Sequence, residues 1–204
     1  MEVAMLPNTV DQRDRSAACE RLLDVAESLF AQRGVAETSV RTITAAAGMN
    51  VAAVNYYFAS KDHLFDAVID RRLPALVAAR EAALSQADGR VESILRAWIE
   101  PSLQVGFAHP EFVRLASRLR FEDDPSRWQG YRGRQADVIA RFLAALRQAL
   151  PDLDPVEVER RFHLVFGVVS HVWAHLPPKT GESAETITNR LVTFLTAGMY
   201  APAP

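Results

Sequence analysis

Residues 21–64 read RLLDVAESLFAQRGVAETSVRTITAAAGMNVAAVNYYFASKDHL. Apolar residues recur at spacings of three and four from Leu22 to Phe30, which is the period of an amphipathic helix. Gly34 marks the end of that helix, because glycine readily adopts the left-handed conformation found after a helix C-terminus. A helix that begins near Asp14 therefore opens the chain and ends before Gly34.

Shorter helices follow in the same stretch. Ser39 is a candidate N-cap for a helix that ends at Gly48, and Asn50 caps a second short helix over 51–58. Two short helices joined by a three-residue turn are typical of a helix-turn-helix motif, here at about 39–58, whose second helix enters a DNA groove. Ser60 caps a longer helix, with Pro74 inside it or at its end.

The rest of the chain also has helical periodicity, and we find no alternating strand pattern. Helices are expected over 90–108, 110–119, 126–150, 156–176 and 182–199. We therefore predict an all-α protein in three parts. A flexible arm spans 1–12, a three-helix DNA-binding domain spans 13–60, and a helical domain for effector binding and dimerisation spans 61–204.

Charge and composition exclude some classes of protein and indicate the cellular compartment. The net charge of −2 excludes a globally basic nucleic-acid binder, although it leaves room for a local contact patch. The single cysteine, Cys19, fits a reducing compartment. Because no apolar run is long enough to span a bilayer and no secretory signal is present, we expect a cytoplasmic protein without a membrane partner. Lys61 is unusual, since 21 of the 23 basic residues are arginine.

Residues 21–64 resemble the N-terminal domain of the TetR family of bacterial transcriptional repressors. The matching residues keep their order and spacing over about 45 positions: Ala26, Leu29, Phe30, Gly34, Thr38, Ser39, Ile43, Ala46, Ala47, Gly48, Tyr56, Phe58, Ser60, Lys61 and Leu64. The resemblance implies a homodimer that binds a double-stranded DNA operator and responds to a small-molecule effector.

The candidate DNA contacts lie around the second short helix. Small residues allow close approach of the backbone, Asn55 can pair with adenine, and the tyrosines reach phosphates or base edges. In the family the lysine that matches Lys61 contacts phosphate. The full set is Ser39, Arg41, Asn50, Val51, Ala52, Asn55, Tyr56, Tyr57 and Lys61.

Several of these residues have structural interpretations as well. Phe58 is expected in the core, one of Tyr56 and Tyr57 can serve packing, and Arg41 can be a solvated surface residue. Asn55 departs from the commonest family pattern, which has tyrosine there, although some subgroups carry the Asn-Tyr pair.

The last two helices carry more apolar residues than one face can bury. Pairing with their symmetry mates would form a four-helix dimer interface, and burial inside one monomer is the alternative. Two DNA half-sites about 34–36 Å apart require a dimer, so we favour the interface. Its candidates are Phe162, Phe166, Val169, Leu191, Phe194 and Leu195.

Aromatic, aliphatic and polar residues of the C-terminal half are candidates for an effector pocket. They are Trp98, Phe107, Phe112, Leu115, Arg118, Phe142, Phe166, His171 and Trp173, although each can equally be core or surface. Arg114, Arg118 or Arg120 can pair with an acidic effector. Arg114-Leu115 and the run from Arg161 to Gly167 are also similar to a fatty-acid-responsive subgroup of the TetR family.

Three histidines, His163, His171 and His175, lie within about 120° of one another around the expected helix at 156–176. Two of them can bind a metal, but no cysteine or carboxylate accompanies them nearby. We therefore expect no metal and no cofactor, and assign these residues to a polar pocket lining or a helix end.

The sequence thus predicts a ligand-responsive dimeric repressor that binds a palindromic operator through 51–58 and is released by a small hydrophobic or acidic effector. A helical interaction module without DNA binding is one alternative. An all-α enzyme is another, but no nucleophile pattern, phosphate loop or paired carboxylates support it, so we expect no enzymatic activity.

Overall fold

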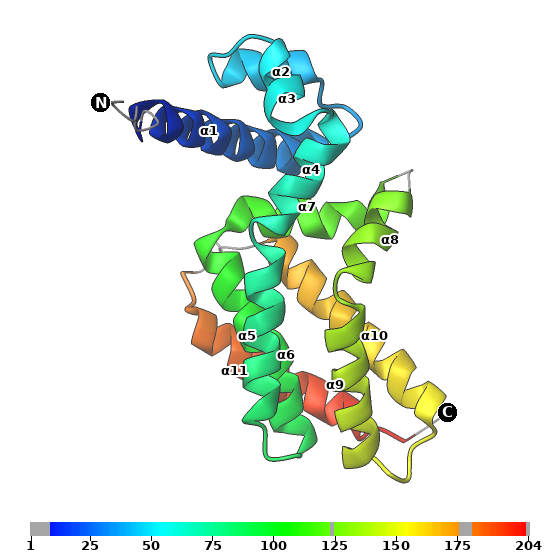
Figure 1. The fold of residues 1–204 in the computed structure, drawn as a ribbon. Helices are drawn as coiled ribbons and strands as arrows, with labels where there is room; N and C mark the ends of the chain where they lie inside the picture. The colour runs from blue at the N-terminus through cyan, green and yellow to red at the C-terminus, as the bar shows by residue number, and fades with distance from the viewer. Residues whose placement is uncertain (1–8, 123–124, 176–180, 203–204) are drawn as a thin grey trace, which may run out of the picture. The chain divides into compact units, whose positions relative to one another are not determined.

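The computed structural model describes residues 9–122, 125–175 and 181–202, and within these ranges the regular structure is helical, as expected. The chain forms two compact units, residues 1–70 and 71–204 (Figure 1). The division follows Asp70 rather than residue 60, because the helix after Ser60 packs on the first helix. Of the described helices, none is both long and apolar enough to cross a membrane.

The N-terminal unit contains α1 (Thr9–Arg33), α2 (Val40–Ala46), α3 (Ala52–Phe58) and α4 (Lys61–Asp70). Residues 9–12 of the expected flexible arm belong to α1, and residues 1–8 lie outside the described residues. The helices pack around one apolar core in which Phe30 and Phe65 meet edge to face, 6.1 Å apart. Other members of this core are Leu22, Ala26, Ile43, Val54, Leu64 and Val68.

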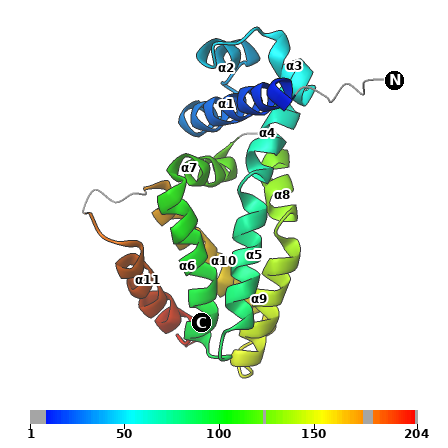
Figure 2. The same ribbon diagram turned by 60° about the vertical axis from the view of Figure 1, so that its left-hand side comes forward.

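The C-terminal unit contains seven α-helices and one short 3-10 helix among its described residues. They are α5 (Leu73–Ser85), α6 (Val91–Ala108), α7 (Pro110–Arg118), η1 (Leu119–Phe121), α8 (Pro125–Gly133), α9 (Ala136–Ala149), α10 (Pro155–Ala174) and α11 (Ala184–Met199). Figure 2 shows α11, α6, α5 and α9 in succession, and each neighbouring pair is in contact. Pro74 lies in the first turn of α5, where a missing N–H costs nothing.

The single helix expected over 126–150 is wrong, because the chain breaks at Arg134 and Gln135 between α8 and α9. Gln135 has φ −112° and ψ 3°, outside the helical range, and its side chain is buried. Its Oε1 accepts a hydrogen bond of 2.8 Å from Arg80 of α5. The break thus allows a polar side chain to turn inward and meet a buried guanidinium.

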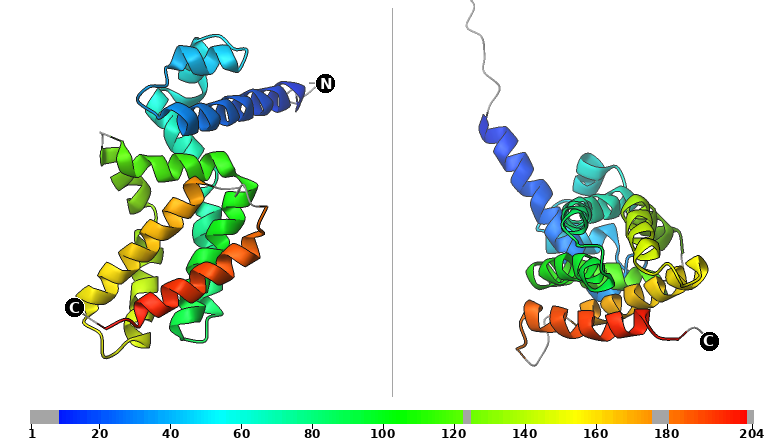
Figure 3. Two further views of the ribbon diagram at one scale, coloured as in Figure 1. Left: turned by 180° about the vertical axis from the view of Figure 1, so that it is seen from behind. Right: turned by 90° about the horizontal axis from the view of Figure 1, so that it is seen from below.

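A second buried arginine joins the last two long helices, which lie side by side in the left view of Figure 3. Arg161 of α10 donates to the carbonyl oxygens of Met199 at 3.0 Å and Ala201 at 2.7 Å, and its Nε donates to Glu157 at 2.8 Å. The last carbonyls of a helix lack intrahelical partners. Arg161 therefore caps the C-terminus of α11 from a neighbouring helix.

Arg161→Met is expected to lower the free energy of unfolding by about 2–4 kcal/mol, because several carbonyls and Glu157 lose a charged donor. Urea denaturation followed by circular dichroism measures this loss. The matched control is Arg160→Met, since Arg160 is the neighbouring arginine and its side chain is 74% exposed. An equal effect of the two substitutions would contradict the capping role.

Candidate DNA-binding surface and effector pocket

The geometry of the helix-turn-helix follows from local hydrogen bonds. Ser39 Oγ accepts from the backbone N–H of Thr42 at 3.0 Å, which caps α2 as predicted. Gly48 has φ +67° in the turn, a conformation that costs glycine little. Asn50 Oδ1 then accepts from the N–H of Ala52 at 3.0 Å and starts α3. Ser39 is thus the cap predicted for α2, whereas the N-cap residue of α3 is Val51, one position after the predicted Asn50.

Helix α3 presents one face away from the core of its unit. Val54 is fully buried, whereas Asn55 and Ala52 are exposed. Val51 and Tyr56 are 51% and 65% exposed, which is unusual for large apolar and aromatic side chains. An exposed row of this kind on a short helix is chemically suited to contacts with base edges and thymine methyl groups.

The remaining predicted DNA contacts differ in exposure. Ser39, Arg41 and Asn50 are exposed, whereas Tyr57 is half-buried and its ring lies 4.8 Å from that of Tyr56, edge to face. Phe58, expected in the core, is half-buried as well. Tyr57 thus supports the position of the Tyr56 ring at the surface.

Lys61 has a structural role that the sequence did not indicate. Its Nζ donates to the carbonyl oxygens of Val35 at 3.0 Å and Thr38 at 3.2 Å. Thr38 Oγ1 in turn donates to the carbonyl of Gly34 at 2.7 Å. The ammonium group therefore holds the connection between α1 and α2 against the start of α4. Its predicted phosphate contact stays a prediction.

The joint between α3 and α4 has an uncommon backbone. Ala59 has φ +64°, which is disfavoured for a residue with a Cβ atom. Immediately after it, Ser60 Oγ accepts from the N–H of His63 at 3.1 Å and starts α4, as expected. The orientation of α3 relative to α4 therefore depends on a tight and conformationally restricted turn.

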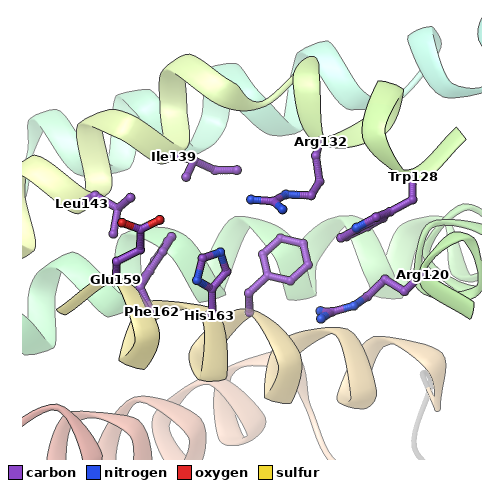
Figure 4. Close-up of a pocket in the computed structure, with 9 residues that line it drawn as sticks. Arg120, Trp128, Arg132, Ile139, Leu143, Glu159, Phe162 and His163 are labelled. Atoms are coloured by element: carbon purple, nitrogen blue, oxygen red, sulfur yellow. The ribbon is translucent and has the colours of Figure 1, made fainter. Parts of the chain in front are cut away.

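A pocket of about 90 Å³ lies in the C-terminal unit between α8, α9 and α10 (Figure 4). Arg132 and His163 point into it from opposite walls. The guanidinium of Arg120 lies over the rings of Trp128 and Phe166, at 5.2 and 5.3 Å from their centroids. The complete lining is Arg120, Trp128, Arg132, Ile139, Leu143, Glu159, Phe162, His163 and Phe166.

The pocket combines apolar side chains with two arginines, Arg120 and Arg132, and one carboxylate, Glu159. Arg120, Arg132 and His163 are exposed, and Glu159 also pairs with Arg147 at 3.6 Å. Such a site suits a small molecule with an apolar body and an anionic group.

The structure separates most of the predicted effector residues from this pocket. Phe166 lines it, whereas Trp98, Phe112, Leu115, Phe142 and Trp173 are buried in the interior of the unit. Phe107 is half-buried, and Arg118 and His171 are exposed. Of the lining residues, only Phe166, Arg120 and His163 are connected with an effector by the sequence. The rest were missed because the lining comes from four elements and follows no regular sequence spacing.

The predicted dimer contacts are also mostly covered within one chain. Phe162, Val169, Leu191 and Leu195 are buried, which agrees with the alternative of a monomer core. Phe194 is 69% exposed. Leu164 of α10, which was not among the candidates, is equally exposed.

The three histidines of α10 and its C-terminal end do not form one cluster. His163 lines the pocket, whereas His171 and His175 are exposed with their rings 4.6 Å apart. His175 Nδ1 lies 2.8 Å from the carbonyl oxygen of His171. Within the described residues, no group of three or more metal-ligating side chains is present.

Comparison with known proteins identifies both units. Residues 22–68 match the model of bacterial regulatory proteins of the tetR family, and residues 92–198 match a tetracyclin repressor-like C-terminal domain. The chain is 31% identical over 160 residues to the uncharacterized HTH-type transcriptional regulator Rv1255c of Mycobacterium tuberculosis, covering 73% of this chain and 71% of that protein.

Two further proteins are similar along most of their length. The HTH-type transcriptional repressor KstR2 of Mycobacterium tuberculosis is 32% identical over 148 residues, covering 69% of this chain and 73% of that protein. The crystal structure of a TetR-like transcriptional regulator from Rhodococcus sp. RHA1 superposes with a TM-score of 0.73 at 21% identity, covering 97% of this chain and 100% of that one. The last similarity concerns the fold alone.

Lys61→Ala is expected to lower the free energy of unfolding by about 1–3 kcal/mol, because two backbone carbonyls lose a charged donor. Urea denaturation measures the change. The control Arg41→Ala removes an exposed cation of the same unit and should stay within about 0.5 kcal/mol of the unchanged protein. A Lys61→Ala protein as stable as the control would refute the structural role.

Proposed function

The chain belongs to the TetR family of bacterial transcriptional regulators, and on this basis we propose that it is a ligand-responsive dimeric repressor. As a member of this family it is a DNA-binding regulator rather than an enzyme. We place it in the cytoplasm, where its DNA target would lie. The exposed face of α3 is the single observation that carries the proposal.

We assign operator reading to α3. Asn55 and Tyr56 are exposed on it and Val51 is exposed immediately before it, while Val54 anchors the helix to the core of its unit. Asn55 has the amide geometry for two hydrogen bonds to adenine, and Val51 offers an apolar contact to a thymine methyl group. Ser39, Arg41 and Asn50 flank this face and are assigned to phosphates, which position the helix without reading sequence.

We assign dimerisation to the outer faces of α10 and α11. These helices contact each other and carry the exposed side chains of Leu164 and Phe194. Large apolar side chains exposed on two adjacent helices are typical of an interaction surface. In a dimer with twofold symmetry both residues would recur on the partner and form a four-helix contact. Two copies would supply two α3 helices for the halves of a palindrome.

The effector is assigned to the pocket between α8, α9 and α10. Its apolar side chains and its cations, Arg120 and Arg132, favour an amphipathic molecule with an anionic group. Such a molecule releases the operator only if it binds more tightly to the form of the dimer that does not fit DNA.

We expect the purified protein to select a palindromic site from genomic fragments, with an affinity that falls as salt rises because phosphate contacts release counterions. Asn55→Ala should weaken binding by about 1–3 kcal/mol through loss of the base contact. Fluorescence anisotropy at two salt concentrations measures both effects. Asn189→Ala, which alters an exposed asparagine of the C-terminal unit, is the control and should bind normally. A folded dimer that selects no DNA would favour a protein-interaction module.

Leu164→Glu combined with Phe194→Glu is expected to convert the dimer into a monomer, because two buried and unpaired carboxylates per subunit oppose the contact. Analytical ultracentrifugation measures the mass. Val51→Glu, an equally drastic change at an exposed apolar residue of the other unit, should leave the dimer intact and abolish DNA binding. A dimer that survives the double substitution places the interface elsewhere.

A further inference from the structure

The interior of the C-terminal unit encloses a charged side chain. Arg80 of α5 is only 2% exposed. Its guanidinium stacks on the ring of Trp98, 3.7 Å from the centroid, and donates to Gln135 Oε1 at 2.8 Å and to Ser102 Oγ at 2.7 Å. These partners come from α6 and from the break before α9, so the cation lies where three elements meet.

The charge of Arg80 is not neutralised by these contacts. Its neighbours Gln135, Ser102, Trp98 and Tyr131 are all uncharged at neutral pH. Burial lowers the pKa of Arg80 to about 10 and raises the pKa of Tyr131 to about 12, which keeps the tyrosine protonated. Arginine is almost never fully buried unless it is paired with an anion. The cluster therefore has the composition of an anion site.

Two donors of the stacked pair also lack acceptors. Among the described residues, neither Arg80 Nε nor Trp98 Nε1 meets a hydrogen-bond partner. Buried donors of this kind are rare because each costs the free energy of its lost hydration. A carboxylate offers two oxygens with about four acceptor positions and carries the missing charge. One such group satisfies both requirements of the site.

One layer of aromatic rings separates the pocket from this cluster. Phe162 and Phe166 line the pocket and pack on Trp98 at centroid distances of 5.0 and 6.1 Å. Trp128 lines it as well and stacks on Tyr131 at 5.8 Å. Phe166 is half-buried and lines the open space, so its ring lies between the pocket and Trp98.

We propose that the pocket and the Arg80 cluster form one effector site, specific for an amphipathic carboxylic acid. The apolar body of the acid lies against Phe162 and Phe166, and its carboxylate reaches the guanidinium of Arg80. Arg120 and Arg132 of the pocket attract the acid, but they are solvated and discriminate weakly. Arg80 discriminates between acids and neutral molecules, because burial shields its charge from water and from dissolved ions. This inference rests on the proposed ligand-responsive function.

The test compares acids with amides of the same shape, using octanoate against octanamide and benzoate against benzamide at constant ionic strength. Binding to the purified full chain is measured by tryptophan fluorescence, since Trp98 lies under Arg80, and by the shift of the thermal midpoint. We expect at least one acid to bind about tenfold or more tightly than its amide, as charged hydrogen bonds require. Equal affinities, or no binding by any of the four probes, overturn the proposal.

Two substitutions in the cluster sharpen the result. Gln135→Glu places a carboxylate beside Arg80 without changing shape, so it should remove the preference for acids and raise the thermal midpoint. Arg80→Met should also remove the preference. The control Arg141→Met removes an exposed cation of α9 and should retain it. A preference that persists in both cluster variants assigns acid recognition to Arg120 and Arg132 and overturns the role of Arg80.

The binding test uses no DNA, which separates it from the test of the proposed function. Acid selectivity that depends on Arg80 supports the site even if no operator is found. Operator binding together with no acid selectivity refutes the site and leaves the repressor assignment standing.

Discussion

A guanidinium buried without a carboxylate organises the C-terminal unit. Arg80 binds one side chain of α6, stacks on another and holds Gln135 at the break between α8 and α9. Removing such a charge from water costs several kcal/mol, which neutral acceptors and a ring face offset only in part. An apolar residue at position 80 would stabilise the folded unit better than arginine does. This cost of Arg80 is consistent with the proposed role in recognising an acid.

The N-terminal unit depends on polar contacts of a different kind. Lys61, Thr38 and Ser39 satisfy backbone groups where α1, α2 and α4 meet, while the apolar core lies beneath them. These contacts fix the position of α3 without using the side chains of Asn55 and Tyr56, which therefore stay exposed. Two residues serve both purposes, because Ser39 caps α2 and Asn50 holds the start of α3, and both are among the proposed DNA contacts.

The sequence predicts features that depend on interactions between near neighbours in the chain better than features that depend on distant partners. Ser39, Gly48, Asn50 and Ser60 act within four residues of themselves, and so the helix-turn-helix was predicted nearly to the residue. Gly133 at the end of α8 is a local signal for the break, but the hydrogen bond that turns Gln135 inward joins it to a partner 55 positions away. An apolar helix such as α10 likewise does not reveal which side faces its own core, which is why Phe162 and Val169 were assigned to the dimer.

The joint at Ala59 has a mechanical consequence. A glycine would adopt the positive φ of this residue as one of many accessible states and would allow α3 to swivel. Alanine admits far fewer backbone states, so the angle between α3 and α4 is stiff. A displacement of α4 would therefore move α3 with it as a rigid body, instead of being absorbed as a bend at the joint.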